Sequence, residues 1–174
     1  MKKKSGPINV LFVCEHNSAR SILAEALLNR LGAGRFEACS AGFDPVSDIS
    51  PYARAMLHRM PYNTGWVSTK PVEAHIGKHA PVFDVIIRLS HGHPAGGQWP
   101  ACRGGQPVIV DWFFDDPRET HVAMANIARA YEEIYIELAA RIDALSKMPH
   151  NLFESGNVAG WLERMDETPL RMAS

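Results

Sequence analysis

The stretch VLFVCEHNSARS, residues 10–21, decides the fold of this chain. Its first four residues continue an apolar run that starts at Ile8 and is typical of a buried parallel strand. The polar loop that follows ends at Arg20, and a helical pattern with leucines at positions 23, 27 and 31 covers residues 21–31. A strand, a loop and a helix in direct succession predict an α/β domain with this loop at the carboxyl end of the strand.

The loop combines a thiol with a guanidinium, because Cys14 begins it and Arg20 ends it. Backbone N–H groups at a helix N-terminus form a nest for anions, and the same positive end favours the thiolate form of Cys14. The fork of Arg20 can hold two oxygens of a tetrahedral anion, and the hydroxyl of Ser21 can stabilise the thiolate. The rest of the expected anion-binding loop is Glu15, His16, Asn17, Ser18 and Ala19. The sequence therefore predicts a nucleophilic cysteine that faces a bound oxyanion.

The remaining patterns alternate between strands and helices. We expect strands at residues 35–41, 82–89 and 108–110, a helix from Pro51 to Met60 with Ser50 as its N-cap, a weaker helix at 71–78, and a long helix at 127–145. This order predicts a three-layer, doubly wound fold in which a four-stranded parallel sheet has helices on both faces. Four polar loops then meet at the carboxyl edge of the sheet. They are residues 14–20, 40–45, 90–107 and 111–117.

Composition excludes several classes of protein. The chain has 174 residues, is 46% hydrophobic and carries a net charge of −1, so it indicates a globular domain without the basic surface that nucleic acids need. No segment approaches the ~20 apolar residues of a membrane helix, and we expect a cytoplasmic protein with no membrane contact. We expect residues 1–149 to form one domain and residues 150–174 an extension that packs on this domain or on a partner.

The loop after the last strand offers a general acid. Asp116 precedes Pro117, which stiffens the loop, and this favours Asp116 over its neighbour Asp115 as the group that protonates a departing oxygen. The three cysteines, Cys14, Cys39 and Cys102, are too few for a disulfide framework. His91 and His93 share a loop with Cys102, but their spacing does not fit a closed zinc site, so we expect no bound metal.

These motifs together resemble the low-molecular-weight tyrosine phosphatase superfamily. The resemblance covers residues 8–145 and rests on the Cys14 to Ser21 loop, the Ser-Ala-Gly of residues 40–42 and the late Asp116-Pro117. Within this superfamily the chain is similar to the arsenate reductase branch. Ala19 stands where the phosphatase branch usually carries a second cysteine, and Arg118 follows Asp-Pro where that branch has tyrosines.

The resemblance implies a low-molecular-weight phosphatase-like fold and a thiol-dependent arsenate reductase. Cys14 would attack an arsenate held by the loop, and a second thiol would resolve the adduct. Thioredoxin-coupled relatives carry two resolving cysteines, of which the first would fall at Ser90, so the second thiol would be Cys102 or an external one. External candidates are glutathione, mycothiol or a glutaredoxin-like redox partner. Lys70 stands where some relatives have an acidic residue of a potassium site, and its ammonium would make that cation unnecessary.

Two alternatives share the same loop. In a low-molecular-weight tyrosine phosphatase or other phosphomonoesterase, water would hydrolyse a phosphate ester formed on Cys14. In a binding or regulatory protein, the loop would hold an oxyanion such as phosphate without turnover. The full set of Cys14, Arg20, Ser21 and Asp116 favours an enzyme.

Overall fold

A computed structural model gives the arrangement of the chain and describes residues 6–102, 105–106, 108–118, 126–149, 151–154 and 158–167. The strands are β1 (Ile8–Cys14), β2 (Phe36–Gly42), β3 (Val85–Arg88) and β4 (Ile109–Asp111). The helices are α1 (Arg20–Leu31), α2 (Pro51–Arg59), α3 (Ile127–Ser146), α4 (Asn151–Glu154), α5 (Val158–Glu167) and the 3-10 turn η1 (Val72–His75).

The four strands form one parallel sheet, as predicted, and their order is β2-β1-β3-β4. β1 pairs with β2 from Ile8 opposite Phe36 to Cys14 opposite Gly42, and with β3 from Val10 to Val13. With a partner on each side, β1 is buried almost throughout, as its unbroken apolar run predicts. Cys14, the last residue of β1, is therefore held at the middle of the carboxyl edge.

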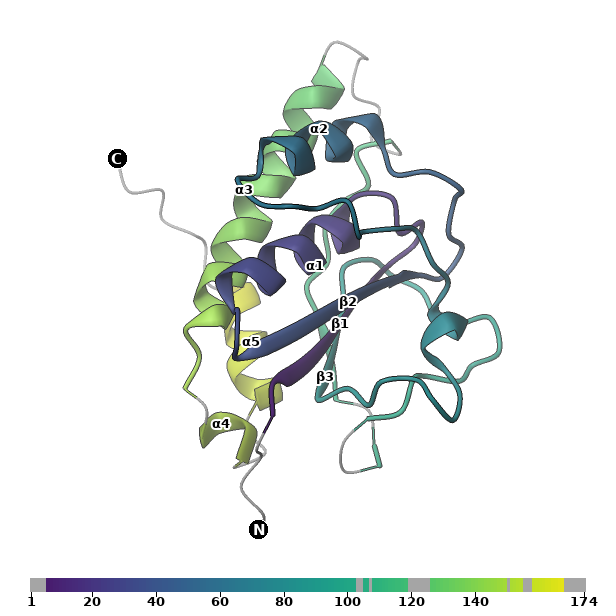
Figure 1. Cartoon of the computed structure of the whole chain (residues 1–174), viewed down its shortest axis with the longest axis vertical. Helices are drawn as coiled ribbons and strands as arrows, with labels where there is room; N and C mark the ends of the chain where they lie inside the picture. The colour runs from purple at the N-terminus through teal and green to yellow at the C-terminus, as the bar shows by residue number, and fades with distance from the viewer. Residues whose placement is uncertain are drawn as a thin grey trace.

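The two faces of the sheet are covered differently. The residues Val10, Phe12 and Cys14 face a large core shared with α1, α2, α3 and α5. Figure 1 shows α1 lying along β2 with α2 and α3 beyond it, and η1 set apart from them. Leu11 and Val13 face a smaller cluster that contains Val72 of η1. A 3-10 turn and loops, rather than a full α-helix, thus cover this second face among the described residues.

Some predicted boundaries differ from the structure. The weak helix expected at residues 71–78 is reduced to η1, and the strand expected at 82–89 is shortened to β3. Phe83 lies outside β3, and its N–H binds the carbonyl of Ala101. Pro51 begins α2 as predicted, but the side chain of Ser50 makes no capping hydrogen bond. The backbone N–H of Ser50 donates instead to the Ser18 carbonyl and ties α2 to the loop.

The C-terminal helix α5 contacts the body of the protein behind β4. Val158 and Leu162 are buried in the large core, and the indole N–H of the fully buried Trp112 donates to the Leu162 carbonyl at 3.2 Å. Because Trp112 directly follows β4, this contact fixes the start of the loop that carries Asp116.

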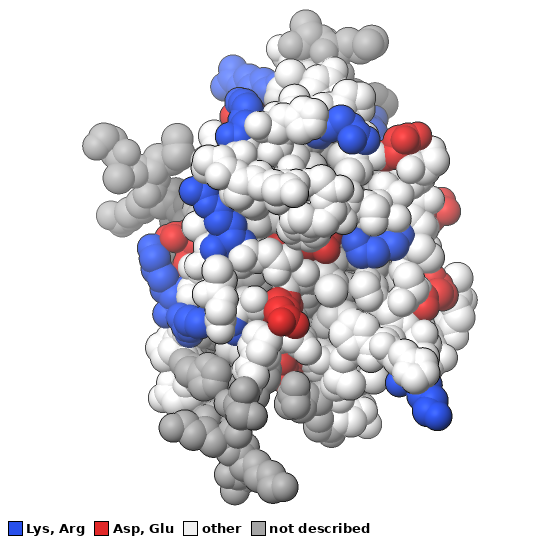
Figure 2. All heavy atoms as spheres, in the orientation of Figure 1, with Lys and Arg blue, Asp and Glu red and all other residues white. Residues whose placement is uncertain are grey.

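The face of the molecule drawn in Figure 2 carries charges of both signs. Figure 2 shows acidic and basic side chains interspersed over one face of the molecule, which agrees with the net charge of −1. Within the described ranges, no helix is both long enough and apolar enough to cross a membrane.

Candidate active site

The loop after β1 is anchored through its carbonyl groups. The carbonyls of Cys14, Glu15 and His16 accept hydrogen bonds from the backbone N–H groups of residues 43, 44 and 46, at 2.8–3.2 Å. Asn17 adopts the left-handed conformation with φ of +44°, which its short amide side chain tolerates. The peptide groups are thus turned so that the carbonyls point toward the neighbouring segment.

The opposite side of these peptide groups is left for a ligand. The N–H groups of residues 15–19 donate to no acceptor in the part of the chain that the structure describes. They lie directly before the N-terminus of α1, where the helix dipole adds a partial positive charge. This arrangement can hold an anion through the backbone, and the binding of an anion by these residues stays a prediction.

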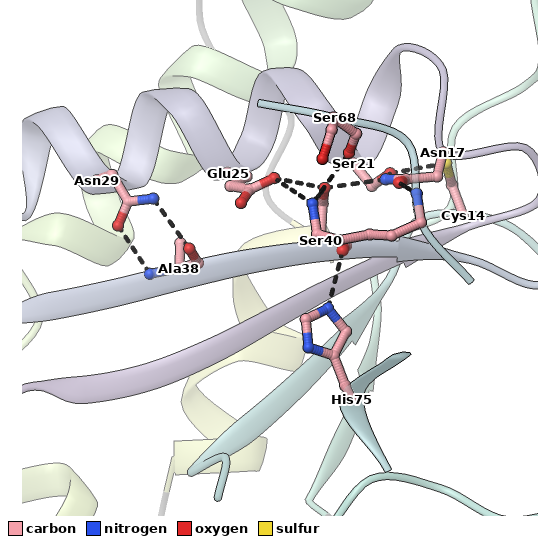
Figure 3. Close-up of polar contacts among 10 residues, drawn as sticks. Cys14, Asn17, Ser21, Glu25, Asn29, Ala38, Ser40, Ser68 and His75 are labelled. Carbon is pink, nitrogen blue, oxygen red and sulfur yellow. Dashed lines mark hydrogen bonds and ion pairs between the residues drawn. The ribbon is translucent and has the colours of Figure 1, made fainter. Parts of the chain in front are cut away.

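Cys14 is held by a chain of side-chain hydrogen bonds (Figure 3). Its Sγ lies 3.0 Å from Oγ of Ser21, and the side-chain amide of Asn17 donates to Oγ of both Ser21 (2.8 Å) and Ser40 (2.9 Å). Because Ser21 Oγ already accepts a hydrogen bond from the Asn17 amide, its own proton is free to point at the sulfur. A hydroxyl in this position donates to a thiolate and stabilises the charged form.

The polar chain extends along one side of α1. Ser21, Glu25 and Asn29 follow one another at four-residue spacing on α1 and therefore share a face, and Asn17 in the preceding loop joins them through its bond to Ser21. Asn29 exchanges two hydrogen bonds with the backbone of Ala38, at 2.8 and 2.9 Å. This stripe covers backbone groups of the edge strand β2, which would otherwise be open to another strand.

A buried carboxylate and a lysine complete this network. Ser40 Oγ donates to Oε2 of Glu25 at 2.5 Å, and Lys70 Nζ lies 3.4 Å from both atoms and 3.0 Å from the Ser68 carbonyl oxygen. Burial raises the pKa of Glu25 above its ordinary value, while the charge of Lys70 and the Ser40 hydrogen bond oppose that rise. The ammonium group of Lys70 thus sits among three oxygens next to the loop, where it balances the charge of Glu25.

Replacing Lys70 by methionine should lower the free energy of unfolding by about 1–2 kcal/mol at pH 7, less than for a fully buried pair because the lysine is partly exposed. Without the ammonium, the pKa of Glu25 rises further, so the folded state holds a proton that the unfolded chain releases. The loss should therefore be greatest at neutral pH and shrink as the pH falls toward the unfolded pKa of about 4.3. Urea denaturation at several pH values measures it. Lys78→Met, at an exposed lysine, is the control; an equal loss there would refute the role of Lys70.

Gly42 shows why the Ser-Ala-Gly motif ends in glycine. A Cβ at this position would lie 2.9 Å from the Glu15 carbonyl oxygen and 3.0 Å from both N and Cβ of Asn17. β2 can therefore pass beneath the loop only if residue 42 has no side chain.

Arg20 connects the loop to the candidate acid. Its Nη1 donates to the Phe114 carbonyl and its Nη2 to Oδ2 of Asp116, both at 2.7 Å. Both side chains are only 6% exposed, so this is a buried ion pair. The structure thus brings Cys14, Arg20, Ser21 and Asp116 to one edge of the sheet, whereas Asp115 is exposed.

Arg118 is a second cation on the same carboxylate. Its backbone N–H donates to Oδ1 of Asp116 at 2.9 Å, and its Nη2 lies 3.1 Å from Oδ2. Burial by itself would raise the pKa of Asp116, but the hydrogen bonds from Arg118 and the charge of Arg20 outweigh it and hold the pKa below its ordinary value. Asp116 is therefore a carboxylate in the ligand-free protein.

A cavity of about 350 Å³ opens beside the loop. The residues that line it come from the three loops after β1, β3 and β4, and include Arg20, Ser90, Asp115 and Asp116. His91 lies against Phe113 with ring centroids 3.9 Å apart, and both residues belong to the cavity wall. A ligand held by Arg20 would thus have access to the acid and to solvent through this opening.

The structure does not bring Cys102 near Cys14. The backbone of Cys102 forms an isolated parallel β-bridge with Phe83, which precedes β3. Cys102 therefore lies at the amino end of the sheet. Val85 stands opposite Val10, so Phe83 is level with Ile8, and six residues of strand at about 3.3 Å each place the two thiols roughly 20 Å apart. Burial also raises the pKa of Cys102. Cys39 lies within β2, where burial raises its pKa to about 11.

Sequence reasoning missed several residues of the site. The sequence does not predict that Glu25 and Ser40 join the network around Asn17, although the four-residue spacing of Ser21, Glu25 and Asn29 indicates a polar face on α1. The sequence marks Arg118 only as a residue that replaces a tyrosine of the phosphatase branch, and it does not predict the contact of Arg118 with Asp116. Among the described residues, no group of three or more His, Cys, Asp or Glu is arranged to hold a metal.

Comparisons with known proteins show the family of this chain. Residues 9–98 match the low molecular weight phosphotyrosine protein phosphatase family. A glutaredoxin arsenate reductase from Synechocystis sp. is 32% identical over 108 residues, which are 62% of this chain and 77% of that protein.

Solved structures show the same fold. An arsenate reductase from Archaeoglobus fulgidus superposes with a TM-score of 0.57 at 22% identity, over 80% of this chain and 99% of the other. A thioredoxin-dependent arsenate reductase from Corynebacterium glutamicum superposes with a TM-score of 0.57 at 27% identity, over 83% of this chain and 63% of the other. A tyrosine phosphatase from Escherichia coli K30 superposes with a TM-score of 0.57 at 15% identity, over 80% of this chain and 96% of the other. Because the family match spans residues 9–98, just over half of the 174 residues, the chain belongs to the low molecular weight phosphotyrosine protein phosphatase family.

Proposed function

We propose that this protein is a thiol-dependent arsenate reductase. The observation that carries the proposal is the open nest of N–H groups at residues 15–19, which directly follows Cys14, together with the 3.0 Å contact between Cys14 Sγ and Ser21 Oγ. Such a nest binds a tetrahedral oxyanion in line with the sulfur. The 32% identity to a glutaredoxin arsenate reductase supports arsenate as that oxyanion.

In the first step, the Cys14 thiolate attacks arsenic and an As–O bond breaks. Arg20 and the loop N–H groups bind the oxygens that remain, and Asp116 donates its proton so that the departing oxygen leaves as water. The product is an adduct with a bond between Cys14 Sγ and arsenic(V).

In the second step, an external thiolate attacks Cys14 Sγ. A disulfide bond forms, the S–As bond breaks, and its electron pair stays on arsenic, which leaves as arsenite, arsenic(III). A further thiol then reduces the mixed disulfide and restores Cys14. An external thiol is favoured over Cys102 because Cys102 lies at the other end of the sheet.

The reductant is a thiol of the glutathione or mycothiol class, or a glutaredoxin-like protein. The names of two relatives indicate glutaredoxin and thioredoxin for those proteins. We also propose that the protein acts in the cytoplasm and binds no metal, nucleic acid or membrane. Residues 150–174 are proposed to form an extension that packs on residues 1–149 or on a partner. The contact between Trp112 and Leu162 supports this packing.

The alternative is a phosphomonoesterase of the tyrosine phosphatase type. The family to which residues 9–98 belong favours it, and the first step would be the same with a phosphate ester. Arg118 weighs against a phosphotyrosine substrate, because the residue after Asp-Pro offers a cation rather than an aromatic wall.

One experiment separates the two functions. The purified protein is given arsenate with glutathione, mycothiol or a glutaredoxin system, and in parallel an aryl phosphate. Arsenite formation that requires an added thiol supports the reductase. Rapid aryl phosphate hydrolysis without arsenite would refute it. The Cys102→Ser variant should form arsenite at the wild-type rate, and a large loss in that variant would restore Cys102 as the resolving thiol.

A further inference from the structure

Ser90 occupies a fixed position between the loop of Cys14 and the loop of Asp116. The preceding residue, Leu89, donates its N–H to the Val13 carbonyl at 2.7 Å and accepts a hydrogen bond from the N–H of Phe114 at 3.0 Å. Both neighbouring segments are therefore tied to the backbone directly before Ser90.

The hydroxyl of Ser90 is buried without a partner. The residue is 9% exposed, and its Oγ has no hydrogen bond. Among the described residues, only one other buried side-chain N or O atom lacks a partner, Oδ1 of Asn9, at the far end of the sheet. An unpaired buried hydroxyl costs free energy, so its presence at a binding site needs an explanation.

The cavity beside the loop supplies that explanation. Ser90 lines it together with Arg20, which the proposed function places on the oxyanion. The carboxylate of Asp116 already accepts hydrogen bonds from Arg20 and Arg118, and it accepts none from Ser90. The carboxylate of Asp116 therefore does not serve as the acceptor for the Ser90 hydroxyl.

We propose that Ser90 Oγ donates a hydrogen bond to an oxygen of the bound tetrahedral oxyanion, and that Ser90 is a substrate-binding residue beside Arg20. The inference rests on the proposed oxyanion site and holds for arsenate and phosphate alike. It makes the loop after β3 part of substrate recognition, although it carries no cysteine at this position.

The test is the binding of inorganic phosphate, measured by calorimetry and by the melting temperature. Ser90→Ala should weaken phosphate binding about tenfold, as expected for the loss of a hydrogen bond to a charged ligand. The ligand-free variant should melt at the wild-type temperature or above, because an unpaired polar group is removed. Ser90→Thr retains the hydroxyl and should bind phosphate within about threefold of the wild type.

Ser47→Ala is the matched control, since Ser47 is exposed and its hydroxyl binds Asp48. It should leave phosphate binding unchanged. Unaltered binding by Ser90→Ala would overturn the inference and leave the oxyanion site intact. A lower melting temperature of ligand-free Ser90→Ala would also overturn it, because it indicates a structural role. If the wild type binds no phosphate, the oxyanion site itself is wrong.

Discussion

The variant Cys14→Ser should lose turnover of arsenate and of aryl phosphates by about 10⁴-fold or more, because a neutral hydroxyl is a far weaker nucleophile than a thiolate. The same variant should still bind phosphate within about threefold of the wild type. The nest of N–H groups and Arg20 do not depend on the sulfur, and Cys14 is only 1% exposed, so the smaller serine fits.

Arsenite formation and phosphate binding by calorimetry measure the two halves of this prediction. The matched control is Cys39→Ser, at the thiol in β2 whose pKa burial raises to about 11 and which therefore stays protonated. It should keep the wild-type rate. Equal losses in both variants would show that the assay reports folding, and more than 1% of the wild-type rate in Cys14→Ser would exclude Cys14 as the nucleophile.

The sheet and the loop could be predicted because they depend on local patterns. The apolar run of β1 requires partners on both sides, and Pro51 marks the start of α2. The loop between Cys14 and Arg20 has a spacing that already implies its geometry. These features follow from neighbours in sequence, so no knowledge of the tertiary structure is needed to find them.

Contacts between distant segments could not be predicted in the same way. The sequence cannot show that Arg118 shares the carboxylate of Asp116 with Arg20, because that depends on how the last loop folds back. It also cannot show that Cys102 is at the far end of the sheet, since a long loop could return to either edge. The expected helix at residues 71–78 shrinks to η1 because its residues cover a small cluster rather than a broad face.

The variant Asp116→Asn should reduce kcat for arsenate reduction by about 10²–10⁴-fold, the usual contribution of a general acid, with a smaller change in KM. In the ligand-free protein, Arg118 and Arg20 hold the pKa of Asp116 below its ordinary value, so the group is ready to accept a proton but not to give one. We expect a bound oxyanion to change this balance. It would compete with Asp116 for the fork of Arg20 and bring negative charge toward Asp116, and both effects would raise the pKa of Asp116.

The pH profile tests this account directly. The acid must be protonated to act, so the wild-type kcat should fall as the pH rises through the pKa of Asp116 in the complex. Asparagine has no proton to lose, so this alkaline limb should be absent from the profile of Asp116→Asn. Asp115→Asn is the control, at an exposed carboxylate on the same cavity wall, and should change kcat by less than about threefold. A larger loss in Asp115→Asn than in Asp116→Asn would assign the acid to Asp115. An alkaline limb that survives in Asp116→Asn would place the titrating group outside this carboxylate.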